Sequence, residues 1–223
     1  KTVEDTLYER FKTVFGVDAY LVAASRTDAG VHALGQVALL KTSLDVDSIL
    51  LKQAWNDKLP SDIVIRSIEK ADSFFHPQRN VLQKTYWYHI FPKRPLPFIS
   101  RYGWFYKRPF DVEKLKIGLN VFIGTHDFRS FCASDYQKDT TRTIQDIQLV
   151  YIKRYNIYRI EVYGQRFLYN MIRRIVGASL YVASRKELSQ QDLQQALAAK
   201  TPQQVLPNAP PLGLLLYKIV YTK

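Results

Sequence analysis

The stretch TIQDIQLVYIKRYNIYRIEVYG (143–164) is the most informative segment for the fold class of this 223-residue chain. Apolar and polar residues alternate on both sides of a turn at Tyr155–Asn156, and alternation with a period of two is typical of strands. Two strands joined by a short turn pair antiparallel. The sequence KTYWYHIF (84–91) alternates in the same way, with Tyr86 and Tyr88 on one face. Such patterns predict a mainly antiparallel sheet, and therefore an α+β fold and not a doubly wound one.

The other elements follow from hydrophobic periodicity and from the positions of Gly and Pro. Helices are expected at 2–15, within 43–60, and at 111–124, 167–183 and 189–199; strands at 18–25, 31–40, 61–71 and the end of 207–223; and a polar loop at 125–142. Asp111 is expected to cap a helix that Gly124 ends, and Ser189 with Asp192 matches a capping box. This order predicts two related α/β halves, residues 1–80 and 81–223.

Charge is distributed unevenly along the chain. The net charge is +12, but residues 1–75 carry 9 basic and 11 acidic residues, whereas the remainder carries 23 basic and 9 acidic. A basic surface in one half points to a polyanionic partner, although a solvated basic face is the alternative. In RYGWFYKRPF (101–110) basic and aromatic residues interleave. Such residues can bind phosphates and stack on splayed bases, which suits looped or single-stranded RNA.

Several classes of protein and site lack support in the sequence. The single cysteine, Cys132, excludes an internal disulfide framework and a Cys-rich zinc module, and it fits a reducing compartment. No apolar run approaches the roughly 20 residues of a membrane span. The four histidines have no partners at metal-ligand spacing, so we expect no metal site. Glycine-rich nucleotide-binding motifs are also missing, and no cofactor is expected.

Two stretches could carry chemistry. In RTDAG (26–30), Asp28 lies two residues from Arg26, and an ionised carboxylate can act as a nucleophile, but the same stretch could be an ordinary turn. In the helix at 167–183, Arg173 shares a face with Asn170, which is either an anion-binding face or a solvated one.

Tyr86 and His32 also allow two interpretations. Tyr86 lies on a predicted strand, where tyrosines usually pack in a core, but a tyrosine facing a nucleic-acid cleft could stack on a base. His32 alternates with apolar residues, which favours a core or interface group.

These signals coincide with one family. The string SRTDAGVHALGQV (25–37) resembles the signature of the tRNA pseudouridine synthase A family. Further similarity to family segments, in family order, occurs in FHPQRN (75–80), KTYWYHI (84–90), FIGTHDFRSFC (122–132), FLYNMIRRIVGASL (167–180) and APPLGLLLYKIVY (209–221). Two departures stand out. The family's opening strand precedes the first helix and is not in this sequence, and Pro77 and Gln78 displace Arg79, which therefore receives no role.

The resemblance implies a fold and an activity. The fold would be two α+β halves around an extended, mainly antiparallel sheet flanked by helices, with the active cleft between the halves. The activity would be conversion of uridine to pseudouridine in tRNA, at positions 38–40 of the anticodon stem-loop, without a cofactor. Members are commonly homodimers, and the cytoplasm is the expected location.

The resemblance also implies roles for five residues. Asp28 would be the catalytic carboxylate, attacking C1′ of the ribose or C6 of the uracil, or acting as a base in a glycal route. Arg173 would pair with Asp28, and Tyr86 would stack on the uracil and assist removal of the C5 proton. Arg26 and His32 would position the loop or the flipped nucleotide.

Two alternatives remain open at this point. One is a non-catalytic RNA-binding protein or RNA chaperone on the same fold, and the other is a family member that acts on other RNAs. A metal-dependent nuclease would need a carboxylate or histidine cluster that the sequence does not contain.

Overall fold

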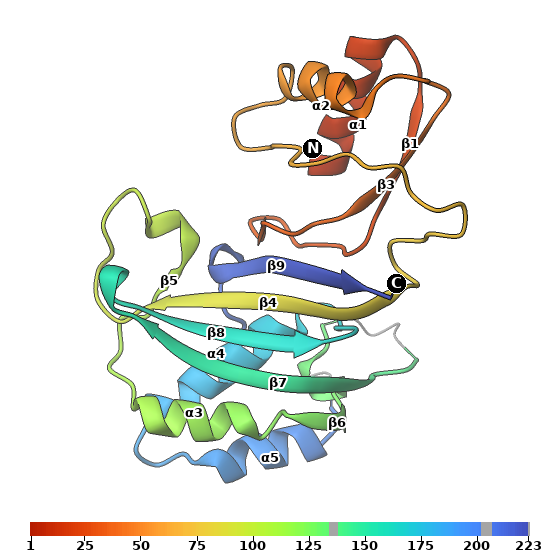
Figure 1. The fold of residues 1–223 in the computed structure, drawn as a ribbon. Coiled ribbons are helices and arrows are strands. Elements are labelled where there is room, and N and C mark those ends of the chain that lie inside the picture. The colour runs from red at the N-terminus through yellow and green to blue at the C-terminus, as the bar shows by residue number, and fades with distance from the viewer. Residues whose placement is uncertain (134–137, 202–206, 223) are drawn as a thin grey trace. The chain divides into compact units, whose positions relative to one another are not determined.

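The computed structural model describes residues 1–133, 138–201 and 207–222. The chain divides into two compact units (Figure 1). Unit 1 contains Lys1–Ala29 and Gln36–Asn80. Unit 2 contains Gly30–Gly35 together with the described residues from Val81 onwards. The chain therefore passes from unit 1 to unit 2 and back within the stretch that carries the RTDAG motif.

Unit 1 is built from two helices and a two-stranded antiparallel sheet. Its elements are α1 (Val3–Phe15), β1 (Ala19–Ala23), β3 (Ala38–Thr42) and α2 (Ser48–Asn56). The side chains of Phe11, Leu51 and Trp55 form its core, and the Trp55 indole nitrogen donates to the carbonyl of Leu7 at 3.2 Å. The expected helices at 2–15 and within 43–60 are confirmed.

The strand expected at 31–40 is two strands. His32–Ala33 forms β2, which pairs parallel with β9 (Leu214–Tyr221) of unit 2, whereas β3 pairs antiparallel with β1. Gly35 allows the break, because a Cβ atom there would lie 2.3 Å from the carbonyl oxygen of Tyr217. Only glycine permits so close a backbone approach.

The strand expected at 61–71 is wrong, because residues 63–70 of that stretch form neither strand nor helix. The side-chain amide of Asn56 replaces a neighbouring strand at Ile65: its nitrogen donates to the Ile65 carbonyl at 2.9 Å and its oxygen accepts from the Ile65 N–H at 2.8 Å. A side chain at the end of α2 therefore satisfies backbone groups that a sheet would otherwise pair.

Unit 2 contains a mainly antiparallel sheet with the strand order β2-β9-β4-β8-β7-β6, and β5 pairs with β4. Its further strands are β4 (Val81–Phe91), β5 (Trp104–Phe105), β6 (Gly124–Asp127), β7 (Thr141–Ile152) and β8 (Ile157–Gly164). The hairpin expected at 143–164 is confirmed as β7 and β8, with Asn156 at φ 50° in the turn. The α+β class is therefore confirmed.

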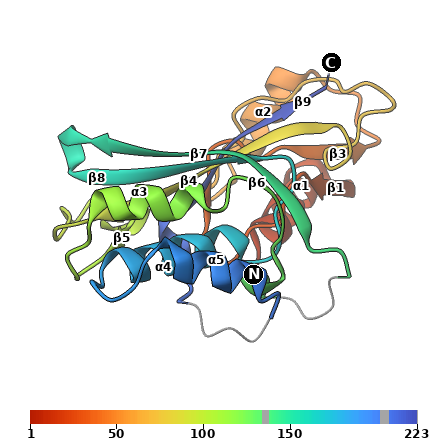
Figure 2. The same cartoon turned by 90° about the horizontal axis from the view of Figure 1, so that it is seen from below.

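Three helices cover one face of this sheet (Figures 1 and 2). They are α3 (Val112–Asn120), α4 (Met171–Ala183) and α5 (Gln190–Ala198). The cap at Asp111 and the capping box of Ser189 are confirmed. Between helices and sheet lies an apolar core that includes the fully buried Tyr88, Ile90 and Ile160.

Some helix boundaries differ from expectation. Helix α3 ends at Asn120, and Gly124, which was expected to end the helix, begins β6 instead. β6 continues to Asp127 and so takes up the start of the expected loop at 125–142, of which residues 134–137 lie outside the described residues. Helix α4 begins at Met171 and not at 167, because Asn170 has φ 60°, outside the helical region. Of the helices in the described ranges, each is too short or too polar to span a membrane.

Candidate functional site

The loop that contains Asp28 follows β1 in unit 1, and its two ends are held together. The N–H of Ala24 donates to the carbonyl of Val37 at 2.8 Å. The Gln36 side chain then bonds both backbone groups of Ser25, accepting at 3.3 Å and donating at 2.6 Å. The bonds between residues 24–25 and 36–37 therefore close the loop. Within it, Arg26 is exposed and Asp28 is half-buried.

The residues that follow this loop are fixed in unit 2. The N–H groups of Leu34 and Gly35 both donate to the carbonyl of Leu216 on β9, at 2.9 and 3.1 Å. His32 is half-buried, and its Nε2 lies 2.9 Å from the carbonyl oxygen of Arg101. Its ring centroid lies 5.0 Å from that of Tyr102.

Arg173 lies in the first turn of α4, and its guanidinium is oriented by two neutral acceptors. Nε donates to the carbonyl of Ala209 at 2.7 Å, and Nη1 donates to Oδ1 of Asn170 at 2.7 Å. The Ala209 N–H in turn donates to the carbonyl of Arg173 at 3.1 Å. These two bonds fix the plane of the guanidinium, a cationic group that can bind an anion.

A glycine makes this arrangement possible. A Cβ atom on Gly177 would lie 2.0 Å from the carbonyl oxygen of Pro207 and 3.0 Å from the amide nitrogen of Ala209. The backbone of residues 207–209 therefore packs directly on α4, one turn after Arg173. The orienting contacts of Arg173 depend on that close approach.

Sequence reasoning did not identify Asn170 as the residue that orients Arg173. Its left-handed backbone (φ 60°) places it as the N-cap residue of α4, and its side chain makes no capping bond there. Asparagine is among the few residues that tolerate this conformation. The available signal was the spacing of three residues that places Asn170 and Arg173 on one face.

Tyr86 lies on β4 with 6% of its surface exposed, and its ring meets the ring of Phe167 edge-on at 5.3 Å. Two residues along the same face, the Tyr88 hydroxyl donates to the carbonyl of Pro210 at 2.8 Å. Burial raises the pKa of Tyr88, and the positive charge of Arg173 opposes that rise. Unit 2 therefore brings Tyr88, Arg173 and the backbone of residues 207–210 into one neighbourhood.

Lys84, on the same strand, is a further basic residue that sequence reasoning did not single out. Burial lowers the pKa of its ammonium group, and the positive charge of Arg166 lowers it further. Two cations placed near each other, one of them partly desolvated, favour an anion beside them. The signal in the sequence was the basic residue two positions before Tyr86.

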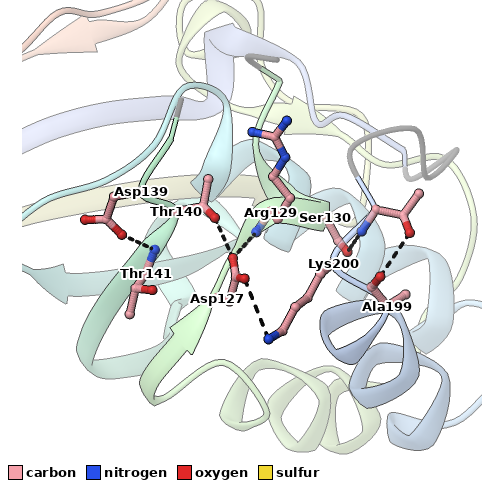
Figure 3. A network of polar contacts seen from close by, with 9 residues as sticks. Asp127, Arg129, Ser130, Asp139, Thr140, Thr141, Ala199 and Lys200 are labelled. Carbon is pink, nitrogen blue, oxygen red and sulfur yellow. Dashed lines mark hydrogen bonds and ion pairs between the residues drawn. The ribbon is translucent and has the colours of Figure 1, made fainter. Parts of the chain in front are cut away.

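A network of polar contacts around Asp127 fixes the end of β6 and the residues that follow it (Figure 3). Its Oδ1 accepts from the Arg129 N–H at 3.1 Å and from the Thr140 hydroxyl at 2.5 Å, and Lys200 Nζ lies 3.8 Å from Oδ2. The GTHDFRSF stretch (124–131) therefore has a structural role: through Asp127 it is joined to Thr140, just before β7, and to Lys200, two residues after the end of α5.

The segment that Asp127 braces then contacts α4. Nη1 of Arg174 donates to the carbonyl of Cys132 at 2.9 Å, and the Ala133 N–H donates to the carbonyl of Tyr169 at 3.1 Å. These bonds fix the residues around the start of α4, where Arg173 lies.

The five residues singled out in the sequence are divided between the units. Asp28 and Arg26 belong to unit 1, and His32, Tyr86 and Arg173 belong to unit 2. Within unit 2, β9 lies between the strands that carry His32 and Tyr86. Among residues 1–133, 138–201 and 207–222, no three His, Cys, Asp or Glu side chains are grouped so that they could hold a metal ion.

Several known proteins similar to this chain are described as tRNA pseudouridine synthases. A family model described as tRNA pseudouridine synthase matches residues 119–222. The tRNA pseudouridine synthase A of Thermoanaerobacter sp. (strain X514) is 37% identical over 222 residues, which cover 99% of this chain and 90% of that protein. The protein of the same name from Thermodesulfovibrio yellowstonii is 32% identical over 231 residues, covering 99% and 91%. The tRNA pseudouridine synthase A 1 of Protochlamydia amoebophila is 37% identical over 206 residues, covering 90% and 79%.

Proposed function

The chain belongs to the tRNA pseudouridine synthase A family, and we propose that Asp28 is the carboxylate with which it converts uridine to pseudouridine in tRNA. The observation that carries this function is the similarity to synthases of that name over 99% of the chain. We assign the target to uridines 38–40 of the anticodon stem-loop, as the family resemblance implies.

The reaction exchanges one bond for another and needs no redox step. The N1–C1′ bond of the uridine breaks, the uracil rotates and a C5–C1′ bond forms. The proton on C5 is released and N1 takes up a proton, so that the product is an isomer of the uridine. Asp28 acts by adding to C1′ or to C6, or by taking a proton from the ribose in a glycal route. All three routes require an ionised carboxylate.

Arg173 is assigned to pair with Asp28. A guanidinium beside a carboxylate favours the charged form of the carboxylate, which is the form that the reaction uses. The proposal is supported by the two bonds to neutral acceptors that orient the guanidinium and by the match of Arg173 to the family's helix motif.

Tyr86 is assigned to stack on the target uracil and to help remove the C5 proton. A uridine in a helical stem must leave its stack before its glycosidic bond can be reached, and an aromatic face compensates for the lost stacking. Arg26 and His32 are assigned to position the loop or the flipped nucleotide. Residues 1–80 then form the half with the catalytic loop, and residues 81–223 the basic half.

Tritium release from tRNA labelled with 5-³H-uridine tests this assignment, in buffer without added metal or nucleotide. We expect the wild type to release tritium and Asp28→Asn to release none while still binding tRNA. Asp62→Asn is the matched control, since Asp62 is an exposed carboxylate of unit 1. Binding without release by the folded wild type would contradict the synthase assignment and favour a non-catalytic RNA-binding protein.

Two finer assignments have their own tests. Transcripts in which uridine 38, 39 or 40 is replaced singly by cytidine identify the target, and release unaffected by all three replacements would contradict positions 38–40. We also propose that the enzyme works in the cytoplasm as a homodimer. Sedimentation equilibrium at micromolar concentration would contradict the homodimer if it gave a mass near 26.0 kDa.

A further inference from the structure

We propose that residues 93–108, called here the basic–aromatic segment, form a tRNA-binding surface of unit 2 that His32 and His89 hold in a fixed conformation. This proposal rests on the proposed function, because it takes tRNA as the polyanion. The segment leaves the end of β4 and returns to it through β5 (Figure 1).

The segment carries five positive charges and no negative charge. Its basic side chains are exposed: Lys93, Arg94, Arg101, Lys107 and Arg108. Within the part of the chain that the structure describes, none of the five forms an ion pair with an acidic side chain. Exposed cations without an acidic partner attract a polyanion and bind its phosphates.

Aromatic rings are exposed among these charges. Phe98 is 67% exposed and Tyr102 is 48% exposed, so both present ring surface to solvent. Exposed rings interleaved with guanidinium and ammonium groups suit RNA, because unpaired bases stack on the rings while phosphates meet the cations. An acidic protein surface could bind the basic side chains, but it would not account for the exposed aromatic rings.

The segment has a defined backbone. The N–H of Tyr102 donates to the carbonyl of Ile99 at 3.0 Å, which closes a turn. The strand β5 then pairs parallel with the end of β4, and the N–H of Tyr106 donates to the carbonyl of Phe91 at 3.1 Å. Both ends of the segment are thereby attached to β4.

Two histidines from different strands hold its centre. Nε2 of His32, on β2, lies 2.9 Å from the carbonyl oxygen of Arg101, and Nδ1 of His89, on β4, lies 3.0 Å from that of Tyr102. Carbonyl oxygens only accept, so both ring nitrogens donate. Two consecutive carbonyls are therefore fixed, and with them the directions in which the Arg101 and Tyr102 side chains leave the backbone.

This arrangement connects two parts of the sequence. His32 lies four residues after Asp28, so the stretch that carries the proposed catalytic carboxylate also carries a support of the surface. Since the segment is ordered before RNA arrives, binding does not have to supply the entropy cost of fixing it.

A charge-removal experiment tests the surface. Arg101, Lys107 and Arg108 are replaced together by Ala, and tRNA affinity is measured by filter binding at several salt concentrations. We expect at least about a tenfold weaker binding at 0.1 M salt and a salt slope reduced by about 2 to 3, as three lost phosphate contacts predict. The control replaces Lys116, Lys153 and Arg154 by Ala, which removes the same charge from exposed positions elsewhere in unit 2. Equal effects of the two triple variants would overturn the proposal.

A second comparison tests the histidines. We expect His89→Ala to weaken tRNA binding several-fold and His89→Asn, which keeps a donor near the position of Nδ1, to restore it. Melting curves show whether both variants are folded, and equal binding by two folded variants would overturn the role of His89.

The outcomes separate this inference from the proposed function. If the wild type binds tRNA through the segment but releases no tritium, the surface stands and the synthase assignment fails. If the wild type forms pseudouridine and the two triple variants bind alike, only the surface fails.

Discussion

Replacing Gly177 by Ala should destabilise the protein, although alanine is the better helix former. The new Cβ atom would lie 2.0 Å from the Pro207 carbonyl oxygen, a distance that real side chains do not adopt. To relieve it, the backbone of residues 207–209 must move by about 1 Å. The bonds between Arg173 and Ala209, at 2.7 and 3.1 Å, would then be stretched beyond hydrogen-bond length.

The size of the effect follows from these contacts. Losing a neutral hydrogen bond costs about 1 kcal/mol, and losing one from a charged group costs about 1.5–3 kcal/mol. Alanine returns about 1 kcal/mol through helix propensity. We therefore expect a net loss of about 1.5–3 kcal/mol, which for a chain of this size lowers Tm by about 3–12 °C.

Thermal melting of Gly177→Ala beside Gly118→Ala measures this prediction. Gly118 lies in α3, where an added Cβ atom would meet only the end of the flexible Leu193 side chain, at 2.9 Å. The control variant should therefore keep or slightly raise Tm. Since Gly177→Ala also disturbs the orientation of Arg173, its rate of tritium release should fall. An unchanged or higher Tm for Gly177→Ala would refute the proposed packing of residues 207–209 on α4.

Three further variants test other contacts. Burial lowers the pKa of His89, and neighbouring charges such as Arg159 have smaller effects. Below about pH 6.5 the unfolded chain therefore binds more protons than the folded protein, and the wild type loses stability as the pH falls. His89→Asn should show a smaller loss in melts from pH 7.5 to 5, and an identical pH profile would contradict this account. Asp127→Ala removes the acceptor shared by the Arg129 N–H and the Thr140 hydroxyl. It should lower the free energy of unfolding in urea by about 1–3 kcal/mol, and a change below about 0.5 kcal/mol would contradict this. Ser189→Ala removes the cap of α5 and should cost about 1 kcal/mol, whereas the same change at the exposed Ser61 should cost little.

Local pattern was sufficient for much of the fold. The hairpin at 143–164 and the capped helices α3 and α5 were predictable because alternation, N-caps and turn residues act over a few positions. The strand expected at 61–71 failed because the Asn56 side chain, and not a neighbouring strand, pairs with the Ile65 backbone. Hydrophobic periodicity does not indicate that a side-chain amide nine residues away will take the place of a neighbouring strand.

For the candidate site, too, some features could be predicted from the sequence and others could not. A motif could identify Asp28, Tyr86 and Arg173 as residues of interest, since the types and spacing are in the sequence. The orientation of Arg173 could not be predicted, because it depends on a backbone carbonyl 36 residues away, at Ala209. Backbone groups are the same at every position, so a carbonyl that acts as an acceptor carries no sequence signature.

The pairing of β2 with β9 also limits how this protein can be divided. A fragment starting at Val81 would lack Gly30–Gly35, so β9 would become an edge strand with the Leu216 carbonyl deprived of its two donors. An apolar strand with an open edge recruits other chains and promotes aggregation. The six residues Gly30–Gly35, from the first third of the chain, therefore cover the edge of the sheet in unit 2. For folding, this means that the last strand of unit 2 gains its outer neighbour only through a contact that spans about 180 residues of sequence, a slow closure of the kind that high contact order produces.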